Sequence, residues 1–198
     1  AIEIDLVPGE DSGFDPDLAT IHVRANETVE YAHDGEEVSV ADDASAVGPL
    51  SLDSFYNGVW YEQARTPTSL TRGCEYATTE HGRDDKGRVT VRDACRQDTA
   101  QGKLREISGI GEILDPGRNA ELKVRYRFGP FTPTRTFRIV AAAPDGAWHI
   151  SAEPKFDKIY VFTRAVAPPR AEVEALIARV RALGYAGEVE IMRTPGRD

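Results

Sequence analysis

From residue 50 onward, apolar and polar residues alternate in short runs that turn-forming sequences separate. We expect turns at 84–87, 115–117 and 143–146, because each of these segments contains both Asp and Gly. Alternation with a period of two sends every second side chain to the same face of a strand. Short strands at nearly even spacing are typical of a closed antiparallel barrel, so the pattern predicts an all-β fold.

The hydrophobic period changes near the C-terminus. Pro169 suits the first turn of a helix and Gly184 suits the position just past its end, so the sequence predicts an α-helix over about 169–184. Its apolar stripe needs a surface to pack against, and the outside of the barrel offers one. The stripe consists of Val173, Leu176, Ile177, Val180 and Leu183.

The N-terminal quarter of the chain differs in charge from the rest. Residues 1–50 contain 13 Asp or Glu and only Arg24 as a base, whereas the remaining residues carry 20 acids and 23 bases. We therefore divide the chain into an acidic extension over 1–49 and a barrel with its helix over 50–198. The basic residues are interspersed with acids and form no run, which argues against nucleic acid as a partner.

The extension has a weak strand pattern of its own. Apolar residues alternate at 21–23, 29–31 and 38–40, and Asp34-Gly35 suits a hairpin turn. It is either a solvated acidic arm or a segment that folds back over one end of the barrel, and a third hypothesis makes it a docking element for a basic partner or a second copy. His22 and His33 lie here without a recognised metal-binding spacing, and we expect no metal and no cofactor.

Two cysteines flank the first expected turn. In an antiparallel hairpin centred on Asp84-Asp85, Cys74 lies directly opposite Cys95, which is the geometry of a disulfide. The same register pairs Tyr76 with Asp93, Thr78 with Val91 and Glu80 with Val89. A structural disulfide implies an oxidising compartment, so we expect a periplasmic, outer-membrane-associated or secreted protein. The alternative is a pair of reduced, buried thiols.

Four ordered blocks of the chain form a recognisable series: Tyr56–Arg65, with its Gly-Val-Trp-Tyr-Glu core, then Leu122–Phe131, Lys158–Arg164, and the tail from Leu183 to Pro195. Together they resemble the lipocalin family, in particular bacterial lipocalins of the outer-membrane lipoprotein and apolipoprotein D-like group. The resemblance implies an eight-stranded up-and-down barrel around a small-molecule cavity, with the C-terminal helix outside. It also implies structural roles for Gly58, Trp60 and Arg164, with the guanidinium laid over the indole at the closed end.

The resemblance also fixes which face of each strand points inward. With Trp60 inside, Glu62 and Ala64 share its face, as do Glu80, Val89, Gly109, Gly111, Ile113, Ala141 and Glu153 on other strands. A slip of one residue would invert a strand. The inward residues that we assign to ligand binding are Glu62, Tyr76, Thr78, Val91, Asp93, Ile107, Leu122, Val124, Tyr126, Phe137, Ile139, His149, Ser151, Lys158, Tyr160 and Phe162.

This inward set contains more charged residues than a carrier of hydrophobic molecules requires. A charge in a dry pocket needs a partner, so these groups lie at a wet mouth, form ion pairs such as Lys158 with Glu153, or carry out proton transfer. The last option would use His149, Tyr160, Glu62 and Lys158 on a bound ligand.

The leading functional hypothesis is a lipocalin that binds, transports or sequesters a small hydrophobic ligand such as a fatty acid, lysophospholipid, isoprenoid or pigment. The alternative is an isomerase or cyclase on the same fold, since a fold alone does not decide function. Peripheral membrane association and a homodimer are further expectations about partners.

Overall fold

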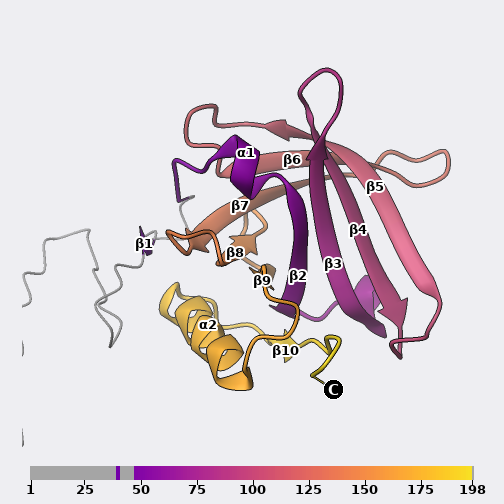
Figure 1. Cartoon of the computed structure of the whole chain (residues 1–198), viewed down its shortest axis with the longest axis vertical. Coiled ribbons are helices and arrows are strands. Elements are labelled where there is room, and N and C mark those ends of the chain that lie inside the picture. Colours follow the sequence, from indigo (N-terminus) through magenta and orange to yellow (C-terminus); the bar gives the residue numbers. More distant parts are fainter. Residues whose placement is uncertain (1–38, 41–46, 198) are drawn as a thin grey trace, which may run out of the picture.

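The computed structural model describes residues 39–40 and 47–197. Strands β2 to β9 form a closed barrel in which each strand pairs with the next along the chain, and β9 pairs with β2 to close it (Figure 1). The predicted eight-stranded up-and-down barrel is therefore confirmed. The barrel strands are β2 (Gly58–Arg65), β3 (Cys74–Arg83), β4 (Val89–Gln97), β5 (Leu104–Ile113), β6 (Glu121–Arg127), β7 (Thr134–Ala142), β8 (Trp148–Ala152) and β9 (Ile159–Thr163).

Because the strands alternate in direction, the loops gather at two ends. The connections 66–73, 98–103, 128–133 and 153–158 surround one end, which we call the mouth. The first of them contains a 3-10 turn at Ser69–Thr71. The turns 84–88, 114–120 and 143–147 lie at the other end, which we call the closed end. There the short helix α1 (Leu52–Phe55) leads into β2, and Phe55 and Tyr56 are buried in the inner core.

A second apolar core lies outside the barrel. The predicted C-terminal helix is confirmed as α2 (Arg170–Ala182), and it buries Val173, Leu176 and Val180. These side chains pack in one cluster with Ile150 and Val161 of the barrel wall. After the helix, the strand β10 (Glu190–Ile191) pairs with the end of β2. Among the described residues, none of the helices has the length and apolar character needed to cross a membrane.

The disulfide between Cys74 and Cys95 is confirmed, with the two Cα atoms 5.4 Å apart. The predicted register of this hairpin, however, is wrong. Cys74 pairs with Gln97, and after a bulge between Glu75 and Thr78 the pairs become Thr79 with Asp93 and His81 with Val91.

Two local features cause this shift. The turn extends to Gly87, which adopts a φ of 73°, so the hairpin is centred later than Asp84-Asp85. At the bulge, Tyr76 has a φ of 53°. As a result Thr79 and His81 face inward, whereas Thr78 and Glu80 face outward, opposite to our expectation. The predicted pairs Tyr76 with Asp93, Thr78 with Val91 and Glu80 with Val89 do not form.

Two further bulges correct the inward assignments of Ala64 and Ala141. One lies between Glu62 and Ala64 in β2, and the other between Ile139 and Ala141 in β7. Both alanines belong to the outer cluster under α2. In β2 the next residue, Arg65, pairs with Tyr160 and lies on the inner face instead.

The other apolar inward assignments on β4 to β7 and β9 hold. The inner cluster contains every predicted apolar residue of β4 to β6 and of β9, together with Phe137 and Ile139 of β7. Alternation therefore placed these side chains correctly wherever a strand has no bulge. The residues concerned are Val89, Val91, Ile107, Ile113, Leu122, Val124, Tyr126, Phe137, Ile139, Tyr160 and Phe162.

Part of the predicted N-terminal extension is described. The strand β1 (Ser39–Val40) pairs with Ala142 and Ala141, at the closed-end terminus of β7. The strands predicted at 21–23 and 29–31, the turn at Asp34-Gly35, His22 and His33 lie outside the described residues. The proposed division of the chain near residue 50 stays a prediction.

Candidate ligand-binding site

Aromatic side chains fill the closed-end part of the barrel interior. Trp60 is fully buried, and the Arg164 guanidinium carbon lies 3.5 Å from the centroid of its ring. Arg164 also donates hydrogen bonds to the carbonyl groups of Val59, Ser54 and Phe55. Gly58 begins the strand with a φ of 77°, a conformation that glycine adopts without strain. The predicted packing of Arg164 on Trp60 is confirmed.

Two buried histidines belong to this aromatic group. The ring centroid of His149 lies 4.4 Å from that of Trp60 and 4.9 Å from that of Phe162. His81 lies beside Tyr56, with 5.4 Å between ring centroids. Neither Nδ1 atom has a hydrogen-bond partner among the described residues. Burial lowers the pKa of His81 to about 4 and holds the pKa of His149 well below its ordinary value, so both rings are neutral at pH 7.

Nearer the mouth, a buried carboxylate meets a buried guanidinium. Arg65 Nη1 lies 3.1 Å from Glu62 Oε1, and Arg65 Nε lies 2.8 Å from Glu190 Oε1. Arg65 Nη2 donates to the carbonyl groups of Thr71 and Cys74, each at 2.8 Å. The guanidinium thus ties β2 to the start of β3 and to β10. Burial raises the pKa of Glu62 to about 7, although the charge of Arg65 opposes the shift.

A second inward carboxylate, Asp93, has hydroxyl partners only. Tyr126 donates to Asp93 Oδ2 at 2.6 Å, and Thr79 donates to Asp93 Oδ1 at 2.8 Å. Asp93 forms no ion pair with any cation of the described residues. Burial raises the pKa of Asp93, while the two hydrogen bonds act against that shift. Asp93 is therefore an acidic group that no cation of the described residues balances directly.

A third polar group lies beside the mouth. Glu153 accepts from Arg135 at 2.7 Å, from Lys158 at 3.2 Å and from the Tyr160 hydroxyl at 3.3 Å. The predicted ion pair between Lys158 and Glu153 is confirmed. Burial and the charge of Glu153 raise the pKa of Tyr160 above its usual range, so the phenol keeps its proton.

Apolar side chains line the barrel between these polar groups. Ile107, Phe137 and Tyr160 pack against the inner core, yet each remains only partly buried. Deeper in the barrel, Val91, Leu122 and Val124 are fully buried in the same cluster. Ser151 is also buried, in register with Tyr160. The interior is thus closely packed toward the closed end and less completely covered toward the mouth.

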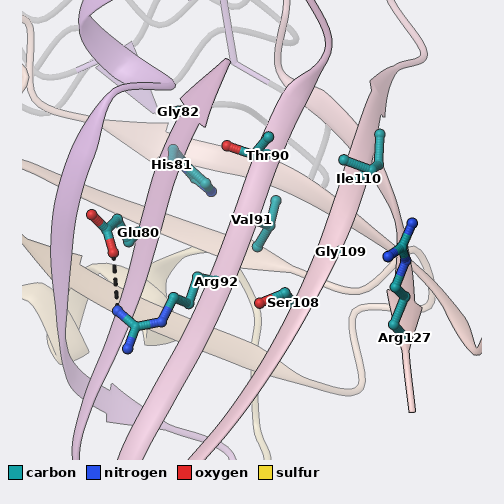
Figure 2. Close-up of a pocket in the computed structure, with 10 residues that line it drawn as sticks. All are labelled: Glu80, His81, Gly82, Thr90, Val91, Arg92, Ser108, Gly109, Ile110 and Arg127. Atoms are coloured by element: carbon teal, nitrogen blue, oxygen red, sulfur yellow. Dashed lines mark hydrogen bonds and ion pairs between the residues drawn. The ribbon is translucent and has the colours of Figure 1, made fainter. Parts of the chain in front are cut away.

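Two surface hollows lie outside this interior. One, of about 420 Å³, is on the outer face of β3 to β6, where Glu80 and Arg92 form an ion pair at 3.2 Å (Figure 2). The other, of about 540 Å³, lies at the closed end between the segment before α1 and the turn after β7, beside Arg164. The outer hollow is lined mainly by outward residues such as Thr90 and Ser108, and its lining includes neither Glu62 and Arg65 nor Asp93 and Glu153. We therefore place the candidate site inside the barrel.

The proposed catalytic group is not assembled in one place. Tyr160 and Lys158 both contact Glu153, whereas Glu62 contacts Arg65. Within the described residues, His149 forms no hydrogen bond with any of them and lies in the aromatic group instead. The enzymatic alternative and the ligand-binding roles of the predicted residues stay predictions.

Three inward polar residues were missed from the sequence: Arg65, Thr79 and His81. The turn signal at Gly87 could have corrected the register and so revealed Thr79 and His81. The bulge that turns Arg65 inward has no comparable signal, because residues 61–65 contain neither Gly nor Pro.

Comparisons with known proteins agree with this architecture. The model of the lipocalin-like domain family matches residues 53–195. A protein of Acanthamoeba polyphaga mimivirus whose name assigns it to the lipocalins is 27% identical over an alignment of 124 positions, and the alignment covers 53% of this chain and 69% of the viral protein.

Solved structures share the fold at low sequence identity. Insecticyanin from the tobacco hornworm Manduca sexta superposes with a TM-score of 0.59 at 14% identity, covering 75% of this chain and 83% of its own. The cockroach allergen Per a 4 gives a TM-score of 0.55 at 16% identity over 75% and 90% of the two chains. H1 crustacyanin from the lobster Homarus americanus gives 0.51 at 13% identity over 76% and 88%.

Proposed function

Because this chain belongs to the lipocalin-like domain family, we propose that its barrel binds a small molecule with an apolar body and a neutral or cationic polar end. The observation that carries the proposal is the lining near the mouth. Ile107, Phe137 and Tyr160 face the interior but remain partly exposed. Apolar surface that points into a barrel and still meets solvent gains free energy when a ligand covers it.

In this proposal the polar end of the ligand lies beside Asp93. Its carboxylate has two hydroxyl donors and no ion pair with a cation of the described residues, so an ammonium group or a hydrogen-bond donor would be attracted to it. A carboxylate would be repelled by Asp93. Arg65 is engaged elsewhere, because its charge is paired with Glu62 and Glu190 and it also binds two carbonyl groups.

These contacts narrow the expected ligand classes. Among the four that the sequence suggested, neutral isoprenoids and pigments suit the acidic interior better than free fatty acids do. The closed-end part is occupied by Phe55, Trp60, His149 and Phe162, which limits the length of chain that enters without repacking. The proposed ligand is therefore compact and occupies the part of the barrel near the mouth.

Fluorescence titration tests the proposal. An environment-sensitive apolar dye is titrated into the protein, and candidate ligands with matched apolar bodies but ammonium, hydroxyl or carboxylate ends then compete with it. We expect saturable dye binding and weaker competition by the carboxylate form. The absence of saturable binding by the dye and by all three ligand forms would refute the proposal.

Two positions on one strand provide a matched pair of variants. Ile107 faces the interior and Ile110 faces the outer hollow, and both are partly buried on β5. Loss of the apolar contact in Ile107→Ser should weaken binding about tenfold, because burying one aliphatic side chain contributes about 1.5 kcal/mol. Ile110→Ser should bind as the wild type does, and equal effects of the two substitutions would place the ligand elsewhere.

We further propose that the protein works in an oxidising compartment, such as the periplasm or the cell exterior. The disulfide between two barrel strands supports this proposal. Alkylation of free thiols in intact cells, followed by mass spectrometry, should find Cys74 and Cys95 unmodified until a reductant is added. We also propose that the chain belongs to the bacterial, apolipoprotein D-like group of lipocalins.

A further inference from the structure

The mouth carries most of the exposed large apolar side chains of the described residues. Leu70, Leu104, Phe128 and Phe131 are 69%, 41%, 65% and 68% exposed, and they come from three different mouth connections or their edges. The other two exposed large apolar residues are Leu114, in a closed-end turn, and Val166, in the segment before α2. Apolar side chains gathered at one end of a soluble domain are typical of a binding surface.

The hairpin between β6 and β7 holds two of these side chains on the same side. Phe128 and Phe131 exchange backbone hydrogen bonds of 2.9 Å across Gly129 and Pro130. Directly paired residues of an antiparallel bridge share a face, so both phenyl rings lie on one face of the tip. Figure 1 shows this connection projecting beyond the barrel wall. A tight turn that presents two phenyl rings to solvent contributes nothing to the core.

A second apolar contact point lies across the mouth. Arg105 Nη2 donates to the carbonyl of Leu70 at 3.2 Å, which links the 66–73 loop to the start of β5. Leu70 and Leu104 are therefore presented by two connected segments, and the Arg105 side chain lies beside them. We call these four residues, Leu70, Leu104, Phe128 and Phe131, the apolar rim.

Positive charge surrounds the apolar rim. We count charges in each mouth loop together with two strand residues on either side. These segments contain nine Lys or Arg and four Asp or Glu, and they span 64–75, 96–105, 126–135 and 151–160. The three closed-end turns taken in the same way, 82–90, 112–122 and 141–149, contain four basic and six acidic residues. Arg72, Lys103, Arg105, Arg127 and Lys155 are exposed, and none of them forms an ion pair with another described residue. The molecule is thus basic at the mouth and slightly acidic at the closed end.

We propose that the mouth docks on an anionic lipid surface. The apolar rim enters the interface between head groups and acyl chains, while the surrounding Lys and Arg side chains bind the lipid phosphates. Apolar side chains surrounded by positive charge distinguish a site for a membrane surface from a purely apolar docking surface. The described part of the acidic extension joins the barrel at the closed end, where β1 pairs with the end of β7. The docking requires neither a ligand nor the polar groups inside the barrel, so it is independent of the proposed function.

Co-sedimentation of the full chain with vesicles tests the proposal. Binding should occur with phosphatidylglycerol–phosphatidylcholine vesicles, weaken as salt is added, and be much weaker with phosphatidylcholine alone. Phe128→Ser/Phe131→Ser should reduce binding to the mixed vesicles about tenfold or more. Lys103→Gln/Arg127→Gln should reduce it about 25-fold, since each of the two basic residues near the surface contributes about a factor of five.

Matched variants at the closed end provide the controls. Leu114→Ser removes an exposed apolar side chain of comparable exposure to Leu104, and Lys86→Gln removes a base from a closed-end turn. Both should bind vesicles as the wild type does. Failure of the full chain to bind the mixed vesicles, or equal losses in the control variants, would overturn the proposal. So would self-association that Phe128→Ser/Phe131→Ser abolishes without any vesicle binding, because the mouth would then be an interface between two copies.

Discussion

Replacing Glu62 by Gln should flatten the dependence of stability on pH. The carboxyl is buried inside the barrel, and its pKa is raised from 4.5 to about 7 by burial, against the opposing charge of Arg65. Since the folded-state pKa lies above the unfolded value, the folded state binds more protons between these two pH values. The free energy of unfolding therefore falls as pH rises through that window. The shift corresponds to a loss on the order of 3 kcal/mol between pH 4.5 and pH 7.5, at about 1.4 kcal/mol for each pKa unit.

Urea unfolding at a series of pH values measures this effect. The wild type should lose that stability as pH rises, whereas Glu62→Gln should lose markedly less, and the difference between the two curves isolates Glu62 from other titrating groups. Arg65 keeps Glu190 and the carbonyl groups of Thr71 and Cys74 as partners in the variant, so the fold is retained. Glu80→Gln, which alters an exposed pair with Arg92, is the control and should follow the wild-type curve. Parallel curves for wild type and Glu62→Gln would refute the reasoning.

Three further changes test the rest of the fold. Cys74→Ser/Cys95→Ser removes a bridge across 21 residues and should lower the free energy of unfolding by about 3 kcal/mol, measured by urea unfolding with and without reductant. Arg164→Met should cost about 2–4 kcal/mol in the same assay, since it removes the cation–aromatic contact and three hydrogen bonds to carbonyl groups. Leu176→Ala should cost about 2–5 kcal/mol through the cavity left under α2, with ligand affinity unchanged because Leu176 lies in the outer core. A wild-type unfolding midpoint that stays unchanged in reductant would contradict the prediction for the disulfide. Loss of ligand binding in Leu176→Ala would contradict the prediction for the outer core.

Features that depend on local sequence could be predicted well. The helix needed only the spacing of Val173, Leu176 and Val180 between Pro169 and Gly184. The period and spacing of the strands indicated an all-β barrel, and its eight strands followed from the resemblance to the lipocalins. The packing of Arg164 on Trp60 followed from the resemblance of two short motifs. The disulfide was predicted correctly from a register that was wrong, because the bulge at 75–78 brings Cys74 close to Cys95 although Cys74 pairs with Gln97.

The interior could be predicted only between bulges. A bulge adds one residue to a strand and inverts the facing of every side chain beyond it, while the composition of the strand stays the same. Ala64 was assigned inward in place of Arg65 for this reason. Thr78 and Glu80 were assigned inward in place of Thr79 and His81 because the turn before β4 is centred later than Asp84-Asp85. These errors affect polar residues most, because an inward apolar residue can also be recognised from the hydrophobic pattern of its strand.

The bulge in β2 explains how this barrel tolerates a carboxylate inside it. With regular alternation after Glu62, Ala64 would face inward and Arg65 would face the outer core, which would leave Glu62 buried without a cation. A lone buried carboxylate is strongly unfavourable, whereas the observed pair is hydrogen-bonded and anchored to two carbonyl groups. Arg65 compensates Glu62, whereas Asp93 has only the hydroxyl groups of Tyr126 and Thr79 as hydrogen-bond partners among the described residues. One inserted residue therefore supplies the cation that Glu62 needs, and our proposal of a neutral or cationic ligand rests on Asp93, which this bulge leaves without such a partner.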